Sequence, residues 1–118
     1  MRWSCNCMTE MIGDGIMSMV ESGVVTNHYK NFNPGKMLAT FALGSNKLYR
    51  FMHRNPALEI HPVDYMNDPY IAGQNDNLHA INATLQIDFL GQCGSESLGC
   101  VPFSGTGGQS DFVRAANR

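Results

Sequence analysis

The chain has 118 residues, of which 43% are hydrophobic and 15% are charged, and its formal net charge is -2 at pH 7. This length favours one compact domain, and the charges form neither a basic stripe for nucleic acid nor an acidic tail. No apolar run approaches the roughly 20 residues that a membrane-spanning helix needs, and the first residues lack the apolar core of a secretory signal. We therefore expect a cytoplasmic protein that binds neither nucleic acid nor membranes.

The stretch 9–15 places one carboxylate, Glu10, before a small-residue turn and an apolar run. Hydrophobic residues then recur at spacings of three and four, which predicts a short amphipathic helix that ends at Gly23. Further on, Asn33-Pro34-Gly35 predicts a turn. From these residues alone, Glu10 is either a nucleophile or an acidic group that caps the N-terminus of the helix, and capping is the more common role.

The middle of the chain predicts a strand, a helix and a second strand. Residues 37–43 form an apolar run typical of a strand covered on both faces, and residues 58–63 predict the next strand. Between them, Ser45 can cap a helix over residues 46–54. Four residues of this helix are expected to face inward: Leu48, Tyr49, Phe51 and Met52. The order favours a parallel crossover unit, so the predicted fold class is α/β, a mainly parallel sheet with flanking helices.

The second half of the chain reads as shorter elements. Residues 64–69 predict a loop, because the residue before Pro69 avoids the helical region, and residues 70–72 predict a helical turn. Apolar and polar residues largely alternate over 78–89, as in a strand with one wetter face, and Gly91 and Gln92 predict a turn. Residues 101–103 predict an edge strand. A glycine-rich stretch, 104–109, precedes a helix predicted from Ser110 to the terminus.

The residue types that often bind metals are not spaced as ligand sets. The four cysteines, Cys5, Cys7, Cys93 and Cys100, lack CxxC spacing, so reduced structural thiols are expected. The four histidines lie in different predicted elements without a carboxylate at ligand spacing. The sequence therefore predicts no metal site.

Strings in one order along nearly the whole chain resemble the acetyl-CoA hydrolase/transferase family, and within it the 4-hydroxybutyrate and acetate CoA-transferases. They include Thr9-Glu10-Met11, Gly23-Val24-Val25-Thr26-Asn27, Ala39-Thr40-Phe41-Ala42-Leu43-Gly44-Ser45, Asn67-Asp68-Pro69, and Gly107-Gly108-Gln109 followed by Asp111-Phe112. The family enzymes are several times longer. The resemblance thus implies that residues 1–118 form a single partial domain, much of the C-terminal domain of such an enzyme.

The resemblance also implies a chemistry. A glutamate attacks an acyl-CoA thioester to give a mixed anhydride, CoA then forms a glutamyl-CoA thioester, and an incoming carboxylate resolves it. Glu10 would be that catalytic glutamate. Gly107 and Gly108 would supply oxyanion donors, with Gly108 the better candidate, and Asn67 would contact the acyl or acid group. Three weaker candidates are Gln109, Asn82 and Gln92. The substrates would be coenzyme A, as acyl-CoA, and a small carboxylate.

Each of these residues also has a purely structural explanation. Glycine pairs are common in turns and helix entries, and asparagine before Asp-Pro is good turn chemistry. The chain departs from the family pattern at Met8 and Asn33, where histidines are usual, and at Gly13, where serine is usual. Two other functions therefore stay open: an acyl-CoA hydrolase, and a non-catalytic remnant or interaction module that keeps the fold. Loss of an N-terminal domain would expose an apolar face, so we expect a homo-oligomer or association through that face.

Overall fold

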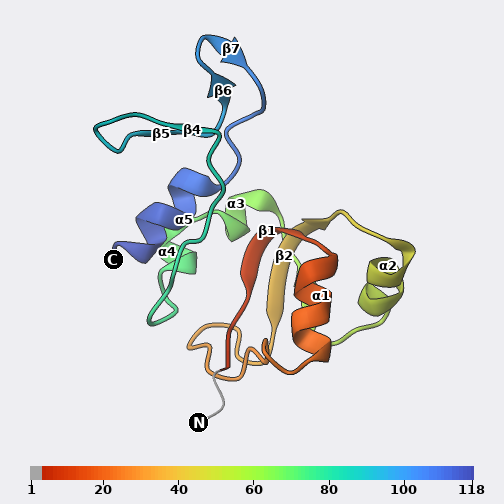
Figure 1. Ribbon diagram of the computed structural model, residues 1–118. Helices are drawn as coiled ribbons and strands as arrows, with labels where there is room; N and C mark the ends of the chain where they lie inside the picture. The colour runs from red at the N-terminus through yellow and green to blue at the C-terminus, as the bar shows by residue number, and fades with distance from the viewer. Residues whose placement is uncertain (1–3) are drawn as a thin grey trace.

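Three parallel strands form the centre of the structure, a computed structural model that describes residues 4–118 (Figure 1). The strands β1 (Met8–Ile12), β2 (Met37–Ala42) and β3 (Leu58–Ile60) lie side by side in that order. Two helices make the crossovers, α1 (Asp14–Glu21) from β1 to β2 and α2 (Asn46–Met52) from β2 to β3. Both strand pairs are parallel. The predicted α/β fold, with a parallel sheet and flanking helices, is confirmed.

The starts of the two crossover helices are tied together by a carboxylate. Ser45 caps α2, because its hydroxyl accepts a hydrogen bond from the Lys47 N–H at 3.2 Å. Asp14, the first residue of α1, accepts from both the N–H and the hydroxyl of Ser45, at 3.0 and 2.7 Å. These two hydrogen bonds hold the pKa of the exposed Asp14 carboxyl below its usual range. The β1–α1 and β2–α2 connections therefore sit at one edge of the sheet.

The core lies between the sheet and the two crossover helices. Its buried members are Cys7, Ile12, Met17, Val25, Met37, Ala39 and Leu48, and partly buried side chains such as Phe51 and Met52 pack against them. The prediction that Tyr49 faces inward is wrong, since this residue is 46% exposed. Consecutive residues on an α-helix point about 100° apart, so the fully buried Leu48 turns Tyr49 toward solvent.

Two local predictions, for residues 8–12 and 64–69, need correction. Residues 8–12 form a strand, and Gly13 is the N-cap of α1, so the helix-capping explanation of Glu10 is wrong. Residues 64–69 are not a loop, because α3 (Val63–Met66) and α4 (Pro69–Ala72) occupy them. Asp68 caps α4 by accepting from the Tyr70 N–H at 2.7 Å, and Pro69 suits the first turn of a helix. Pro62, the N-cap of α3, also ends β3 earlier than predicted.

The predicted strand over residues 78–89 is also wrong. Only β4 (Gln86–Ile87) is a strand there, paired antiparallel with β5 (Cys93–Gly94), and β6 (Ser97–Leu98) pairs with β7 (Val101–Pro102). Figure 1 shows both hairpins projecting from the body of the molecule. Alternation stabilises a strand only when one face is covered, and Ile81, Ile87 and Phe89 are 93%, 65% and 110% exposed. The predicted turn at Gly91 and the edge strand at Val101 are confirmed.

The chain ends in α5 (Gln109–Ala116), which packs on α4 (Figure 1). This helix confirms the predicted C-terminal helix, beginning one residue earlier. The longest helices of the described residues, α1 and α5, have eight residues each, and none of those helices is long and apolar enough to cross a bilayer. All four cysteines have free thiols, as expected, although only Cys7 is buried.

One buried lysine lies beneath the loop that leads into β2. Lys30 is 6% exposed, and its Nζ donates to the backbone oxygens of Lys36, at 2.9 Å, and Cys7, at 3.4 Å. Burial lowers the pKa of Lys30 from 10.5 to about 8, and burial raises the pKa of the neighbouring Cys7 thiol from 9.0 to about 11. The folded protein therefore holds both groups in their neutral forms more readily than the unfolded chain does.

This lysine predicts a rise of stability with pH. Between pH 8 and 10.5 the unfolded chain binds more protons at Lys30 than the folded chain, so the free energy of unfolding increases with pH; Cys7 opposes this only above about pH 9. Relative to Lys30→Met, the wild-type chain should gain about 1 kcal/mol between pH 7 and 9. Urea unfolding at both pH values measures the difference. Lys47→Met, at an exposed lysine, keeps Lys30 and should therefore show the same rise with pH as the wild-type chain. Equal slopes for all three proteins would contradict the burial of a neutral Lys30.

Candidate active site

The candidate site is built around Glu10, in the middle of β1 and partly buried. Its Oε2 accepts a hydrogen bond from Asn67 Nδ2 at 3.0 Å. Asn67 is the C-cap of α3, a single helical turn that contacts both β1 and β2. The Asn-Asp-Pro turn thus brings the Asn67 amide into hydrogen-bond contact with the Glu10 carboxylate, 57 residues earlier in the sequence.

Gly108, the N-cap of α5, closes over the same carboxylate. A Cβ at this position would lie 2.6 Å from Glu10 Oε2, 2.7 Å from Asn67 Nδ2 and 3.0 Å from Phe112 Cε2. The first two separations are shorter than real Cβ contacts, so a side chain at this buried position would displace Glu10 and Asn67 from where they lie. The structure therefore brings together three of the predicted site residues, Glu10, Asn67 and Gly108.

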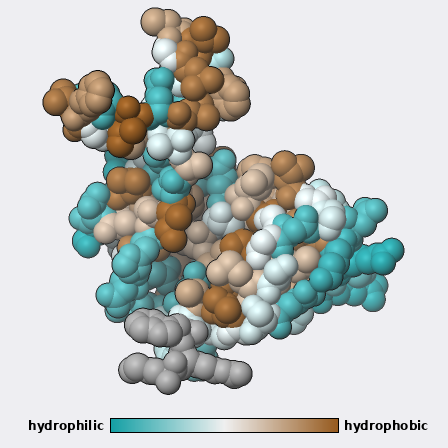
Figure 2. All heavy atoms as spheres, viewed as in Figure 1, coloured by the Kyte–Doolittle hydropathy of each residue, from teal (hydrophilic) through white to brown (hydrophobic). Residues whose placement is uncertain are grey.

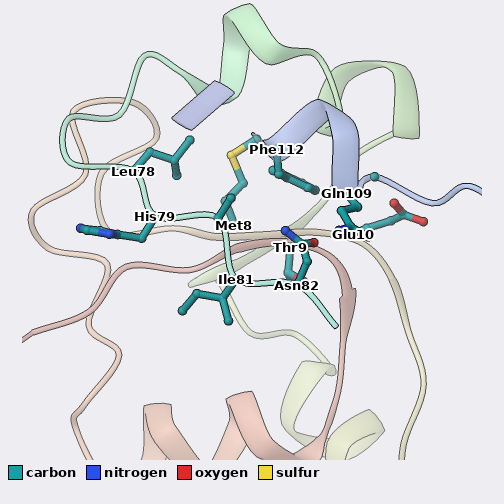
Figure 3. A pocket seen from close by; sticks show the side chains of 11 residues that line it. Met8, Thr9, Glu10, Leu78, His79, Ile81, Asn82, Gln109 and Phe112 are labelled. Carbon is teal, nitrogen blue, oxygen red and sulfur yellow. The ribbon is translucent and has the colours of Figure 1, made fainter. Parts of the chain in front are cut away.

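A cavity of about 140 Å³ lies beside this group (Figure 3). Its walls come from β1, from the extended segment 78–82 and from the start of α5, and the lining residues are Met8, Thr9, Glu10, Leu78, His79, Ala80, Ile81, Asn82, Gly108, Gln109 and Phe112. Gln109 and Asn82, two of the weaker candidates, are among them. Figure 3 shows Gln109 beside Glu10, whereas His79 points away from it.

Two other candidates lie elsewhere. Gly107, with φ of +55°, lines an adjoining surface hollow together with Asn67 and Asp111, and does not line the Glu10 cavity. Gln92 lies in the exposed turn of the β4–β5 hairpin, where its N–H donates to Asp88 Oδ1 at 2.8 Å. The structure brings Gly107 to the edge of the site and leaves Gln92 outside it.

Several lining residues were not predicted from the sequence. Met8 and Phe112 belong to β1 and α5, and Figure 3 shows the Met8 side chain reaching toward Phe112 and Leu78. Phe112 lies four residues after Gly108 and belongs to one of the strings that carry the family resemblance, which was the one signal available for it. The segment 78–82 gave no such signal, because its alternation predicted a strand. Its place along β1 depends on contacts between residues about 70 positions apart.

The lining carries a single carboxylate among amide, hydroxyl, imidazole and apolar side chains. Glu10 is the one carboxylate among the described residues that line the cavity, and no described residue donates a hydrogen bond to its Oε1. Amide groups of Gln109 and Asn82 and backbone near Gly108 line the same cavity. Among residues 4–118, no three His, Cys, Asp or Glu side chains gather as a metal ligand set. The arrangement offers an oriented carboxylate with a hydrogen-bond donor, Asn67 Nδ2, beside it.

Known sequences that are similar to this chain point to one family. A sequence model of the acetyl-CoA hydrolase/transferase C-terminal domain matches residues 44–118. Succinyl-CoA:cyclohexane-1-carboxylate CoA transferase from Geobacter metallireducens is 55% identical over 109 residues, which are 92% of this chain and 25% of that protein. The 4-hydroxybutyrate coenzyme A transferase of Clostridium kluyveri is 48% identical over the same shares of both chains.

Solved structures agree with these sequence relatives. RipA from Yersinia pestis superposes with a TM-score of 0.84 at 43% identity, covering 98% of this chain and 25% of that chain. A 4-hydroxybutyrate CoA-transferase from Porphyromonas gingivalis gives 0.83 at 35% identity, covering 98% and 26%. The chain spans about a quarter of the length of each of these proteins. The chain therefore belongs to the acetyl-CoA hydrolase/transferase family.

Proposed function

We propose that this chain supplies the nucleophile and part of the substrate pocket of a cytoplasmic acyl-CoA:carboxylate CoA-transferase of the 4-hydroxybutyrate or acetate type. Residues 1–118 would be a partial C-terminal domain of that enzyme. One observation carries the proposal. The Glu10 carboxylate is held by Asn67 and covered by Gly108 at the wall of a cavity large enough for a small acyl group.

The proposed reaction uses Glu10 as a nucleophile and as a leaving group. A Glu10 oxygen attacks the thioester carbonyl carbon, the C–S bond breaks, and CoA thiolate leaves an acyl-glutamyl anhydride. The thiolate then attacks the glutamyl carbonyl carbon and the product acid leaves, which gives a glutamyl-CoA thioester. The incoming carboxylate attacks the glutamyl-CoA carbonyl carbon and releases CoA thiolate, which gives a new acyl-glutamyl anhydride. The thiolate then attacks the acyl carbonyl carbon, so the new acyl-CoA departs and the Glu10 carboxylate is regenerated. Splitting the exchange in this way replaces one difficult step by easier ones.

The neighbouring residues suit the charges that develop in these steps. Each attack passes through a tetrahedral oxyanion, which needs donors fixed in advance. The Gly108 N–H is the proposed donor, with Gly107 next to it, because a Cβ at residue 108 would push the Glu10 carboxylate from its place. Asn67 Nδ2, at 3.0 Å from Oε2, would orient the carboxylate and then contact the bound acyl group. Gln109 and Asn82 line the same cavity and would contact the substrate.

A chimaera tests this function in a complete enzyme. The matching 109 residues of the Geobacter metallireducens relative would be replaced by those of this chain, and CoA transfer to acetate, to 4-hydroxybutyrate and to cyclohexane-1-carboxylate would be followed by chromatography. We expect transfer to at least one acid. A folded chimaera that transfers CoA to none of them, beside an active parent enzyme, would favour the non-catalytic remnant.

The same assay separates transfer from hydrolysis. If water resolves the glutamyl-CoA thioester, free CoA accumulates at the same rate with and without an acceptor acid. We expect instead that an acceptor acid raises the rate of thioester consumption, as a ping-pong exchange requires. Free CoA released equally under both conditions would identify the chimaera as a hydrolase.

We also propose that the two hairpins mediate association of this chain with a second copy. Figure 2 shows apolar residues gathered over both hairpins. The most exposed of them are Ile87, Phe89, Leu90, Val101 and Phe103, each at least 65% exposed. Exposed apolar surface of this extent commonly marks a protein interface. The hairpins contribute little to the core, so they can be changed without unfolding the sheet.

This association predicts a change in oligomeric state. The double variant Ile87→Ser, Phe89→Ser should be monomeric at concentrations where the wild-type chain sediments as a dimer or larger species, because it removes two of the largest apolar contacts. Analytical ultracentrifugation measures the difference. Leu43→Ser, at a site outside the hairpins that is 65% exposed like Ile87, should leave the association unchanged. A wild-type chain that stays monomeric at every concentration would contradict this interface.

A further inference from the structure

Two polar atoms close to Glu10 are buried without a partner among the described residues. They are the hydroxyl oxygen of Thr40, on β2, and Oδ1 of Asn67, whose Nδ2 contacts Glu10. Buried hydroxyl and amide atoms in folded proteins are nearly always hydrogen-bonded, since an unpaired one loses its bonds to water without replacement. Both atoms are closed off from solvent, so their partner must come from the protein itself.

The strand register places the Thr40 side chain on the same face of the sheet as Glu10. Thr9 pairs with Ala39 and Met11 with Phe41, which sets Glu10 beside Thr40 on the neighbouring strand. Side chains of paired residues in a parallel sheet point to the same face. The helical turn α3 contacts both strands and ends at Asn67, directly over Glu10. Thr40, Glu10 and Asn67 therefore form one compact group.

We propose that Thr40 is a positioning residue for the catalytic site, whose hydroxyl donates to Asn67 Oδ1. A threonine hydroxyl has one rotatable donor, and an amide oxygen is an acceptor only. One hydrogen bond therefore satisfies both unpaired atoms. The bond requires the Thr40 hydroxyl to turn toward Asn67 about the Cα–Cβ bond.

This bond would decide which way the Asn67 amide points. With Thr40 holding Oδ1, the Nδ2 group faces Glu10 and donates to it, as the structure shows. With the amide reversed, two acceptors would face each other and the carboxylate would be pushed from its place. The effect on catalysis rests on the proposed role of Glu10 as the nucleophile, whereas the orientation of the amide does not.

Thr40→Val tests the proposal, because valine keeps the shape and the strand preference and removes only the hydroxyl. In the 118-residue chain, the side-chain amide NMR signals of Asn67, identified by their loss in Asn67→Ala, should shift in Thr40→Val and return in Thr40→Ser. Thr84→Val is the control, since the Thr84 hydroxyl bonds backbone oxygens at the base of the β4–β5 hairpin. Unshifted Asn67 signals in Thr40→Val would overturn the proposal.

Activity gives a second, separate readout. In the chimaera, Thr40→Val should lower kcat about tenfold, the loss expected for one orienting hydrogen bond, with little change in KM and recovery in Thr40→Ser. In an Asn67→Ala background the same change should have no further effect, because Thr40 acts through Asn67. Additive losses would overturn the coupling. An inactive chimaera with shifted Asn67 signals would reject the proposed function and leave the Thr40 bond in place.

Discussion

Replacing Gly108 by alanine should abolish most of the activity while costing little stability. The new Cβ would lie 2.6 Å from Glu10 Oε2 and 2.7 Å from Asn67 Nδ2, both at the ends of flexible side chains. These atoms can move aside, so the fold should survive with a loss of about 1 kcal/mol. The carboxylate, however, would be displaced from its position by about an ångström, and such a shift costs roughly a hundredfold in rate.

The matched control for this prediction is Gly105→Ala. An added Cβ at Gly105 meets nothing within 4 Å, and both glycines belong to the same stretch before α5. In the chimaera, kcat of Gly105→Ala should stay within about twofold of wild type, while thermal melting of both variants stays close to wild type. Equal activity of Gly108→Ala and Gly105→Ala would mean that the close approach to Glu10 has no catalytic role.

Glu10→Gln should remove CoA transfer while preserving the fold. Glutamine keeps the size of the side chain, and its amide oxygen can still accept from Asn67 Nδ2, so stability should change by less than about 1 kcal/mol. A neutral amide neither attacks a thioester nor leaves from an anhydride, so kcat should fall by about a thousandfold or more, as for other lost nucleophiles.

Glu21→Gln is the control for that loss. Glu21 lies on α1, where its carboxylate pairs with Lys47 at 3.0 Å on the exposed surface, and such pairs contribute little. This variant should transfer CoA at the wild-type rate, measured by the same chromatographic assay. Substantial transfer by Glu10→Gln, with Glu21→Gln unaffected, would require a nucleophile other than Glu10.

The strands β2 and β3 and the two crossover helices could be predicted because their signals are local, whereas β1 was missed. The apolar run of β2, the Ser45 cap and the turn at Asn33-Pro34-Gly35 each depend on neighbouring residues, and each forms as predicted. The strand over residues 78–89 was wrong for the opposite reason. Whether an alternating segment becomes a strand depends on a covering surface that the segment itself does not encode.

The candidate site could also be predicted only in part from the sequence. The resemblance pointed to Glu10, Asn67 and Gly108, and the structure places all three in contact. The cavity wall of Met8, Phe112 and residues 78–82 follows from how β1, α5 and an irregular segment meet, which no spacing in the sequence specifies. The proposed role of Thr40 could not be predicted from the sequence either, since it follows from strand register and from an unpaired buried oxygen.

The most direct test of the account is covalent trapping at Glu10. The chain, alone and with the unmatched part of the Geobacter metallireducens relative, would be incubated with acetyl-CoA, treated with borohydride and analysed by peptide mass spectrometry. A glutamyl-CoA thioester is reduced to an alcohol, so the peptide that contains Glu10 should lose one oxygen and gain two hydrogens, and the Glu10→Gln variant should show no change. An unmodified Glu10 under both conditions, with the parent relative labelled in parallel, would contradict its role as the nucleophile.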